Sequence, residues 1–548
     1  MHVVALENPS KFKAKNRQKC QLMNNATSNR GMVTSPNAVA SECGASVLRA
    51  GGTAVEAAIA TCAALYVTYP HFCGLGGDAL LVLADKSGKV QAVSGIGQAA
   101  QNIAGYEQHI PVRGPRSALT SAGAVSALEC AWHISRDQMG GKSSWFSLWE
   151  PAMALAFEGY AISKSERFWL QFRQNERDAL ADVFNSFCQN DVLPKVGELR
   201  RRPDLGLSMK AIATRGARDF YEGELASDLA KGLRAAGSPL RAVDLAATHA
   251  RAEAPLRLPY RDGVLVSQPP PTQGMSTLQI MGILDNFDLQ KLTQGSADHY
   301  HLMVEAIKLA FDDRNQYLSD PDFVDVPTQR LLSPGYLSAQ AAQINMQQAK
   351  AWPNVYQHGD TVYVGACDAA GNAASVLATV YFDWGSGVMV GDSGILWHNR
   401  GAAFSTDKHH PNILASGKRP FHTLNPGMYL KNNKPHILFG TQGADGQPQT
   451  LAALLTRLID YDMDPASALA APRFLLGKTF SDSSDNLKLE SDVPIGVVRS
   501  LKERGHQLSM TDAQSPLMGH PGAIVIHTDS GSMIGAHDPR SDGLAIGV

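Results

Sequence analysis

Residues 53–69 constrain the fold more than any other segment, because nearly all of their side chains are apolar or small. Thr53 and Glu56 have the spacing of a capping box, which predicts that a helix begins here. Pro70 predicts where that helix ends. A helix without a polar face has to be buried. The fold must therefore place other layers of secondary structure on several sides of this helix.

The rest of the chain alternates between hairpin patterns and helical patterns. Alternating apolar residues around turn sequences predict strands, and apolar residues spaced three and four apart predict helices. Ser35 is the expected N-cap of the first helix, with Pro36 at its first position. These patterns favour one α+β or layered α/β body. The predicted strands are 79–84, 90–93, 361–367, 373–382, 523–527 and 533–536, and the predicted helices include 36–50, 145–159, 298–318, 449–461 and 494–503.

The composition is that of a globular protein with a large core. Of 548 residues, 44% are apolar and 18% are charged, and the formal net charge is -2. This balance gives no electrostatic footprint for nucleic acid or for an anionic membrane. The sequence has no run of about 18 apolar residues, and its first basic residues follow a short apolar run, the reverse of a secretory signal. We therefore expect a cytoplasmic protein with a loose extension at residues 1–30.

Cysteine and histidine spacing argues against a disulfide framework and against a metal site. The seven cysteines are scattered and form no CxxC pair, which is typical of a reducing compartment. His398, His409, His410 and His422 stand at irregular spacings in predicted loops. We expect ordinary surface or core histidines, one of which could contact substrate, and neither a metal ion nor a cofactor.

The glycine-rich loop at residues 74–77 admits two interpretations. A phosphate-binding loop has the order strand, glycines, helix, so that the helix N-terminal amides face the anion. Here the glycines follow the predicted helix 53–69 and precede the predicted strand 79–84. That order favours a tight turn or a close approach to the active site over nucleotide binding.

Thr361 stands at the start of a predicted strand, directly after Gly359 and Asp360. Threonine is a common strand residue, so this position alone does not indicate catalysis. Cleavage of the Asp360–Thr361 bond would give Thr361 both a hydroxyl and a free α-amine. An α-amine with an ordinary pKa of about 7.7–8.0 can act as general base for that hydroxyl at neutral pH. Such a nucleophile needs no separate histidine.

Several dispersed motifs follow one another in a characteristic order. Near the N-terminus stand MVTSPNAVASECGASVLRAGGTAVEAAIA and PHFCGLGGDALL, and the middle carries PPPTQG and YHLMVEAIKLAFDDRNQYLSDPDF. The later motifs are GDSGI, KRP, APRF and AHDPR. With these motifs the chain resembles the gamma-glutamyltransferase family over residues 31–548. In that family a threonine lies seven residues before the aspartate of a D-x-x-G-N turn; that aspartate is Asp368, which places the threonine at Thr361.

The resemblance implies an N-terminal nucleophile hydrolase with a four-layer αββα sandwich and no cofactor. It implies that the precursor cuts itself between Asp360 and Thr361. A large chain, residues 31–360, and a small chain, residues 361–548, would then stay together as one intertwined body. Two such bodies could form a dimer of heterodimers.

The resemblance also implies roles for individual residues. Thr361 takes the nucleophile position, and Thr379 takes that of a second threonine that orients the nucleophile. Gly443 and Ala444 correspond to the glycine pair whose backbone amides form the oxyanion hole. His422 and Thr423 replace the paired serines that follow KRP in the family.

Two departures from the family pattern argue against glutathione as the substrate. A γ-glutamyl group carries an α-carboxylate and an α-ammonium, and family members that use glutathione bind both. The arginine for the carboxylate corresponds to Ile96 here, and the aspartate for the ammonium corresponds to Ala403. Each lost charge-assisted hydrogen bond is worth about 1.5–3 kcal/mol.

Arg400 stands where many relatives have an uncharged glutamine, near His422 and Thr423 in the alignment. A cation without an ammonium acceptor suits an anion that lacks an amine, so these three residues are the expected substrate-binding residues. A structural salt bridge of Arg400 is the equal alternative. Within the family, the resemblance favours a small anionic amide, oxamate, hydrolysed to oxalate and ammonia in purine catabolism. The alternatives are a γ-glutamyl transferase acting on glutathione, a glutaryl- or cephalosporin-type acylase, and a non-catalytic binding protein.

Overall fold

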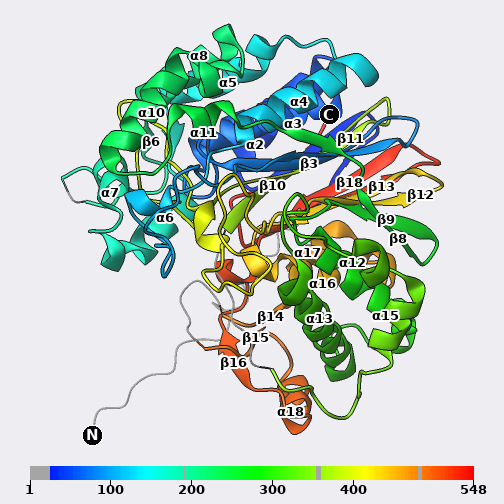
Figure 1. The fold of residues 1–548 in the computed structure, drawn as a ribbon. Helices are drawn as coiled ribbons and strands as arrows, with labels where there is room; N and C mark the ends of the chain where they lie inside the picture. The colour runs from blue at the N-terminus through cyan, green and yellow to red at the C-terminus, as the bar shows by residue number, and fades with distance from the viewer. Residues whose placement is uncertain (1–24, 191, 353–359, 479–483) are drawn as a thin grey trace, which may run out of the picture.

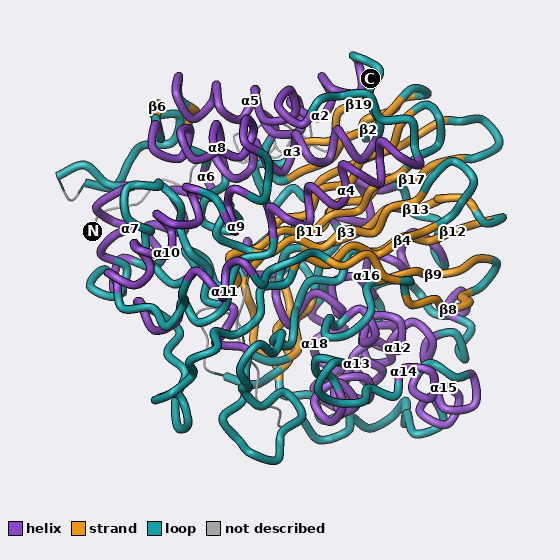
Figure 2. Tube along the Cα trace, turned by 45° about the horizontal axis from the view of Figure 1, so that its top comes forward, coloured by secondary structure: helices purple, strands orange, loops and turns teal. Residues whose placement is uncertain are grey.

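The computed structural model describes residues 25–190, 192–352, 360–478 and 484–548. Within these residues, two antiparallel sheets of seven strands each stack face to face (Figure 1). Figure 2 shows helices on both sides of the stacked strands. This arrangement confirms the predicted four-layer αββα sandwich.

Both sheets combine strands from before residue 360 with strands from after it. Sheet 1 contains, in spatial order, β1 (Ala26–Ser28), β18 (Ser532–His537), β17 (Pro521–His527), β13 (Lys434–Thr441), β12 (Gly427–Lys431), β9 (Gly263–Ser267) and β8 (Leu256–Tyr260). Sheet 2 contains, in spatial order, β19 (Leu544–Gly547), β2 (Gly31–Ser35), β10 (Asp360–Asp368), β11 (Ala373–Tyr381), β3 (Asp78–Ala84), β4 (Val90–Gly95) and β7 (Arg251–Glu253).

The helix predicted from the apolar segment lies against sheet 2. It is α3 (Ala54–Thr68), and every one of its residues is buried. The predicted capping box is present, with the Thr53 side chain accepting from the Glu56 amide and the Glu56 side chain accepting from the Thr53 amide. One side of α3 packs on β10 and β11, and the other sides contact α2 (Ala38–Arg49), α4 (Ala124–Gln138) and α5 (Trp145–Glu158).

A second group of helices covers the outer face of sheet 1. α12 (Gly274–Leu284) packs on β8 and β9, and α16 (Gln447–Ile459) packs on β13. α13 (Ala297–Tyr317) lies outside them and contacts α15 (Pro334–Ala341) and α18 (Ile495–Glu503).

The remaining α-helices and strands of the described residues are α6 (Lys164–Phe172), α7 (Ala181–Phe187), α8 (Pro203–Arg215), α9 (Asp219–Glu222), α10 (Glu224–Ala236), α11 (Ala242–Ala246), α14 (Thr328–Leu331), α17 (Pro465–Ala470), β5 (Tyr160–Ala161), β6 (Leu199–Arg200), β14 (Phe474–Leu476), β15 (Leu487–Glu490) and β16 (Leu508–Thr511).

Two predictions near the N-terminus need correction. Ser35 does not cap a helix: it ends the buried strand β2, and α2 begins at Ala38 with the Asn37 side chain accepting from the amides of Val39 and Ala40. The loose extension predicted over residues 1–30 extends too far toward the C-terminus. Its residues 26–28 form β1, which pairs with β18 at the edge of sheet 1. Residues 1–24 lie outside the described residues.

The described part of the chain contains no covalent cross-link and no membrane span. Its cysteines are all free. None of the described helices combines the length and the hydropathy that a bilayer span requires.

Candidate functional site

Thr361 lies at the beginning of β10, in the middle of sheet 2, and is fully buried. The register between β10 and β11 shifts between Asp360 and Val362, so that Thr361 lies opposite two residues, Thr379 and Val380. Two residues facing one form a β-bulge, a common device for aiming a side chain beside an active site. The bulge brings the predicted nucleophile beside the predicted second threonine.

Gln447, the first residue of α16, contacts the hydroxyl of Thr361. Its Nε2 donates a hydrogen bond of 3.1 Å to Thr361 Oγ1, and the glutamine is fully buried. A donor at this oxygen fixes one lone pair of the hydroxyl, and it would stabilise negative charge on the oxygen if Thr361 acts as a nucleophile. No motif in the sequence predicts a role for Gln447, although it stands directly after the loop that contains Gly443 and Ala444.

We predict that Gln447→Leu slows both self-cleavage and turnover about fivefold to tenfold, because it removes one hydrogen bond worth about 1 kcal/mol. The rate of chain cleavage after expression and the initial rate of turnover would measure the effect. Gln449→Leu is the matched control, since Gln449 lies on the same helix and is bonded to Leu476 instead. Equal slowing in both variants would show that the effect is a general loss of stability.

Thr379 lies near the end of β11, where it faces Asp78 of β3. Its Oγ1 accepts a hydrogen bond of 2.8 Å from the amide of Tyr381. Tyr381 has a φ of 77°, which is uncommon for a residue with a side chain. The Thr379 hydroxyl therefore holds the turn that ends β11, and its predicted role in orienting Thr361 stays a prediction.

The glycine-rich loop at residues 74–77 passes close to the same strand. A Cβ atom added at Gly77 would lie 2.1 Å from the carbonyl oxygen of Thr379, so only glycine fits this position. The glycines therefore serve a close backbone approach beside the site, which is the interpretation that the order of elements favoured.

Gly443 and Ala444 lie in the loop after β13, the central strand of sheet 1, and begin the helical turn before α16. Their φ angles are 131° and 48°, so both backbones are in the left-handed range. Gln273 Nε2 donates to the carbonyl oxygens of Ala444, at 2.7 Å, and Thr423, at 2.8 Å. The loop is thus held in one conformation, which an oxyanion hole made of backbone amides requires.

We predict that Ala444→Gly raises the free energy of unfolding by about 0.5–1 kcal/mol, because a left-handed alanine carries a steric cost that glycine avoids. Ala444→Val should have the opposite sign, since a β-branched side chain fits this φ least well. Urea unfolding of the two variants beside the parent checks both signs. A less stable glycine variant would mean that packing of the Ala444 methyl group outweighs backbone strain.

Arg400 is fully buried and its guanidinium lies over the ring of Tyr381, with Cζ 3.7 Å from the ring centroid. Its Nη2 donates to Thr423 Oγ1 at 3.2 Å, while Nε and Nη1 have no hydrogen-bond partner among the described residues. Burial lowers the pKa of Arg400 to about 10, so the group is still charged at neutral pH. No described carboxylate lies within ion-pair distance of Arg400, so the alternative of a structural salt bridge gains no support.

His422 is buried next to this arginine and is bonded to Asp78. Its Nε2 lies 3.1 Å from Asp78 Oδ2, and its Nδ1 accepts from the Leu424 amide at 3.3 Å. Burial and the charge of Arg400 lower the pKa of His422 to about 3, so the ring is neutral. Because both ring nitrogens are engaged, these contacts do not support His422 as a direct substrate contact.

Ile96 and Ala403, which correspond to the arginine and the aspartate that bind a γ-glutamyl group in the family, have apolar surroundings in the structure. Ile96 packs in a buried cluster with Leu80 and Leu424. Ala403 packs with Tyr381 and its neighbour Phe382, close in sequence to Arg400. Neither position offers a charge to the two ends of a γ-glutamyl group.

A threonine at the head of a central strand, between the two sheets of an αββα sandwich, is the arrangement of the N-terminal nucleophile hydrolases, and this chain is an enzyme of that class. Residues 40–548 match the family model described as gamma-glutamyltranspeptidase, and the chain belongs to that family. The family consists of autoprocessed hydrolases that act on amide bonds.

Three relatives show how the family varies around this chain. The oxamate amidohydrolase proenzyme of Klebsiella pneumoniae is 39% identical over 95% of this chain and 99% of its own length. The glutathione hydrolase proenzyme of Escherichia coli is 30% identical over 94% of this chain and 92% of its own. The crystal structure of a cephalosporin acylase from Bacillus halodurans superposes with a TM-score of 0.88 at 30% identity, covering 96% of this chain and 97% of that one.

Proposed function

We propose that Thr361 is the nucleophile both of self-cleavage and of amide hydrolysis, and that the substrate is a small amide with a neighbouring carboxylate and no amine. Oxamate is the first candidate, which would place the reaction in purine catabolism. The proposal rests on the buried Thr361, on the residues around it, and on the similarity to the oxamate amidohydrolase proenzyme.

Self-cleavage uses the Thr361 hydroxyl once. Thr361 Oγ1 attacks the carbonyl carbon of Asp360, the peptide C–N bond breaks, and an ester joins Asp360 to Thr361. Water hydrolyses this ester, which leaves a carboxylate on Asp360 and a free amine on Thr361. Because each sheet contains strands from both sides of this bond, the two products would stay associated.

Turnover uses the same hydroxyl again. The freed amine of Thr361 takes the hydroxyl proton, and Oγ1 attacks the amide carbon of the substrate. The amides of Gly443 and Ala444 stabilise the negative oxygen that forms. Ammonia leaves with the proton, and water then cleaves the acyl ester to release the acid and restore Thr361.

The buried guanidinium of Arg400 is the observation that supports the proposed substrate. It is a buried cation whose Nε and Nη1 have no hydrogen-bond partner in the part of the chain that the structure describes, so an incoming carboxylate would satisfy these donors. Thr423, bonded to the same guanidinium, offers a further polar group. Arg400 supports the binding of a carboxylate. Ala403, at the position of the family's ammonium-binding aspartate, supports a substrate without an amine.

The test combines the intact mass of the purified protein with an ammonia-release assay on oxamate, using the same sample. We expect two chains that separate before Thr361, and ammonia from oxamate but no glutamate from glutathione. Cleavage without oxamate turnover would contradict the substrate, and a single uncut chain would contradict the nucleophile.

A glutaryl- or cephalosporin-type acylase is the second candidate, favoured by the similarity to the cephalosporin acylase structure. A glutaryl group also has a carboxylate and no α-amine, so Arg400 would suit it too. Hydrolysis of a glutaryl amide by a protein inactive on oxamate would establish this alternative.

A further inference from the structure

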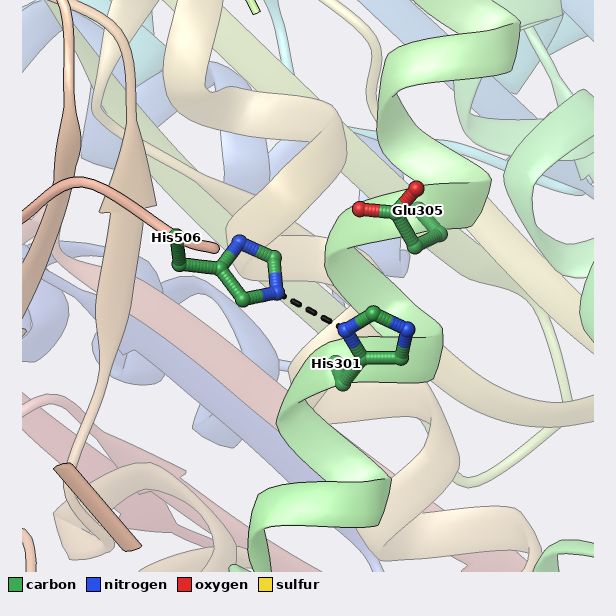
Figure 3. Close-up of side chains that lie close together, drawn as sticks. All are labelled: His301, Glu305 and His506. Carbon is green, nitrogen blue, oxygen red and sulfur yellow. Dashed lines mark hydrogen bonds between the residues drawn. The ribbon is translucent and has the colours of Figure 1, made fainter. Parts of the chain in front are cut away.

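Two histidines and a glutamate meet outside the catalytic site, where α13 contacts the end of α18. His301 and Glu305 lie one turn apart on α13, and His506 faces them from the loop after α18 (Figure 3). One ligand atom from each side chain lies within 4.8 Å of the other two, and all three residues are buried.

We propose that His301, Glu305 and His506 bind a divalent transition-metal ion, with zinc the closest match. Two imidazole nitrogens and one carboxylate oxygen form a typical zinc donor set, which leaves a fourth position for water. This site is separate from the catalytic residues, where we expect no metal.

The two imidazoles already face one another as ligands would. His301 Nδ1 and His506 Nε2 are 2.8 Å apart and share a hydrogen bond. Two nitrogens on one tetrahedral zinc ion lie about 3.3 Å apart, given Zn–N distances of about 2.0–2.1 Å. To bind an ion in place of the shared hydrogen, the two nitrogens must therefore move apart by a few tenths of an ångström. The proton on His506 Nε2 must also move to Nδ1 of the same ring.

The surrounding backbone orients two of the three ligands. His301 Nε2 lies 2.9 Å from the carbonyl oxygen of Asn345, to which it donates, and this directs Nδ1 at the cluster. Glu305 Oε2 accepts from the Lys350 amide at 2.9 Å. Such outer contacts are the usual support of metal-binding histidines and carboxylates.

The charges that face the cluster are Glu305, Lys308, Lys350 and Arg504. Lys308 Nζ lies 2.7 Å from Glu305 Oε1 and opposes a cation, but it also donates to the Lys350 carbonyl, at 2.6 Å, and can keep that partner. The Lys350 ammonium is paired with Asp312, and Arg504 is paired with Asp298. We therefore expect weaker binding than at a closed structural zinc site.

A cavity of about 430 Å³ adjoins the cluster at His506 and is also lined by Lys308, Arg504, Trp352 and Asp485. If the chain is cleaved as proposed, His301 and Glu305 belong to the large chain and His506 to the small chain. The ion would then join the two chains.

The test uses the full protein without a histidine tag, stripped with a chelator and titrated with zinc chloride by calorimetry. Cobalt chloride on the same sample gives a visible absorption spectrum that reports nitrogen ligation. We expect one ion per pair of large and small chains and a higher Tm with zinc. The absence of saturable binding in the parent protein would overturn the proposal, and this arm needs no variant.

His506→Gln separates metal binding from the hydrogen bond, because glutamine can still donate to His301 Nδ1 but has no ring nitrogen to offer. We expect at least tenfold weaker zinc binding and no zinc-dependent rise in Tm in His506→Gln and in Glu305→Gln. His133→Ala, on the exposed face of α4, is the matched control and should bind like the parent. Unchanged zinc binding in His506→Gln would also overturn the proposal. Chain cleavage and ammonia release, measured on the same samples, report on the proposed function independently.

Discussion

Thr361→Ala is expected to remain a single uncut chain and to hydrolyse no amide. The substitution removes the oxygen that we propose attacks both the Asp360 carbonyl and the substrate. Losing a nucleophile of this kind costs on the order of 10⁴–10⁶ in rate. Intact mass measures the missing cleavage, and the ammonia-release assay measures the missing turnover.

Two further variants make this expectation specific to the hydroxyl. Thr361→Ser keeps the oxygen and should still be cut, while Thr361→Val keeps the shape of the side chain and should not. Thr34→Val is the matched control: this buried threonine lies on β2, beside β10, and is bonded to Ala536 and His537. Cleavage or activity in Thr361→Ala or Thr361→Val would show that another residue is the nucleophile.

Local patterns predicted the elements of the fold better than their arrangement. α3 could be predicted because its capping box and its apolar surface are local features, and the β10–β11 hairpin because its two strands flank a turn at Asp368. The order of strands in the sheets could not be predicted. β19 pairs with β2 and β18 with β1, so strands about 500 residues apart meet at the sheet edges, and no local signal records such a pairing. The N-terminal error had a local cause, because a Ser-Pro pair resembles a helix start even where it ends a strand.

The candidate site likewise contains residues that the sequence predicts and residues that it does not. The resemblance to the family predicts Thr361 as the nucleophile from its spacing to Asp368, whereas no sequence pattern indicates Gln447 or Gln273. Their importance depends on which strands and loops meet in space: Gln447 reaches Thr361, and Gln273 bridges the segments of Thr423 and Ala444. The positive φ of Ala444 was equally hidden, because alanine is not the residue that normally marks such a backbone.

Arg400→Gln is expected to lower kcat/KM for oxamate about tenfold to 150-fold, which corresponds to the loss of a charge-assisted hydrogen bond of about 1.5–3 kcal/mol. Most of the loss should appear in KM, because the carboxylate is bound both before and during the reaction. Arg400→Lys keeps the charge but not the planar group of donors and should fall between the parent and the glutamine variant. Kinetics on oxamate across the three proteins give this order.

Two controls distinguish substrate binding from a structural role of Arg400. Self-cleavage involves no substrate carboxylate, so Arg400→Gln should still be cut before Thr361. Slow hydrolysis of an uncharged primary amide, which offers Arg400 no anion, should be unaffected. The Tm should not fall, because the substitution removes a buried cation whose Nε and Nη1 have no partner among the residues that the structure describes. Leaving such donors unpaired is itself unfavourable. A lower Tm with failed cleavage would make Arg400 a structural residue. Unchanged oxamate kinetics in a stable, cleaved variant would remove the observation on which the choice of an anionic amide rests, and the acid group of the substrate would then have to be bound elsewhere.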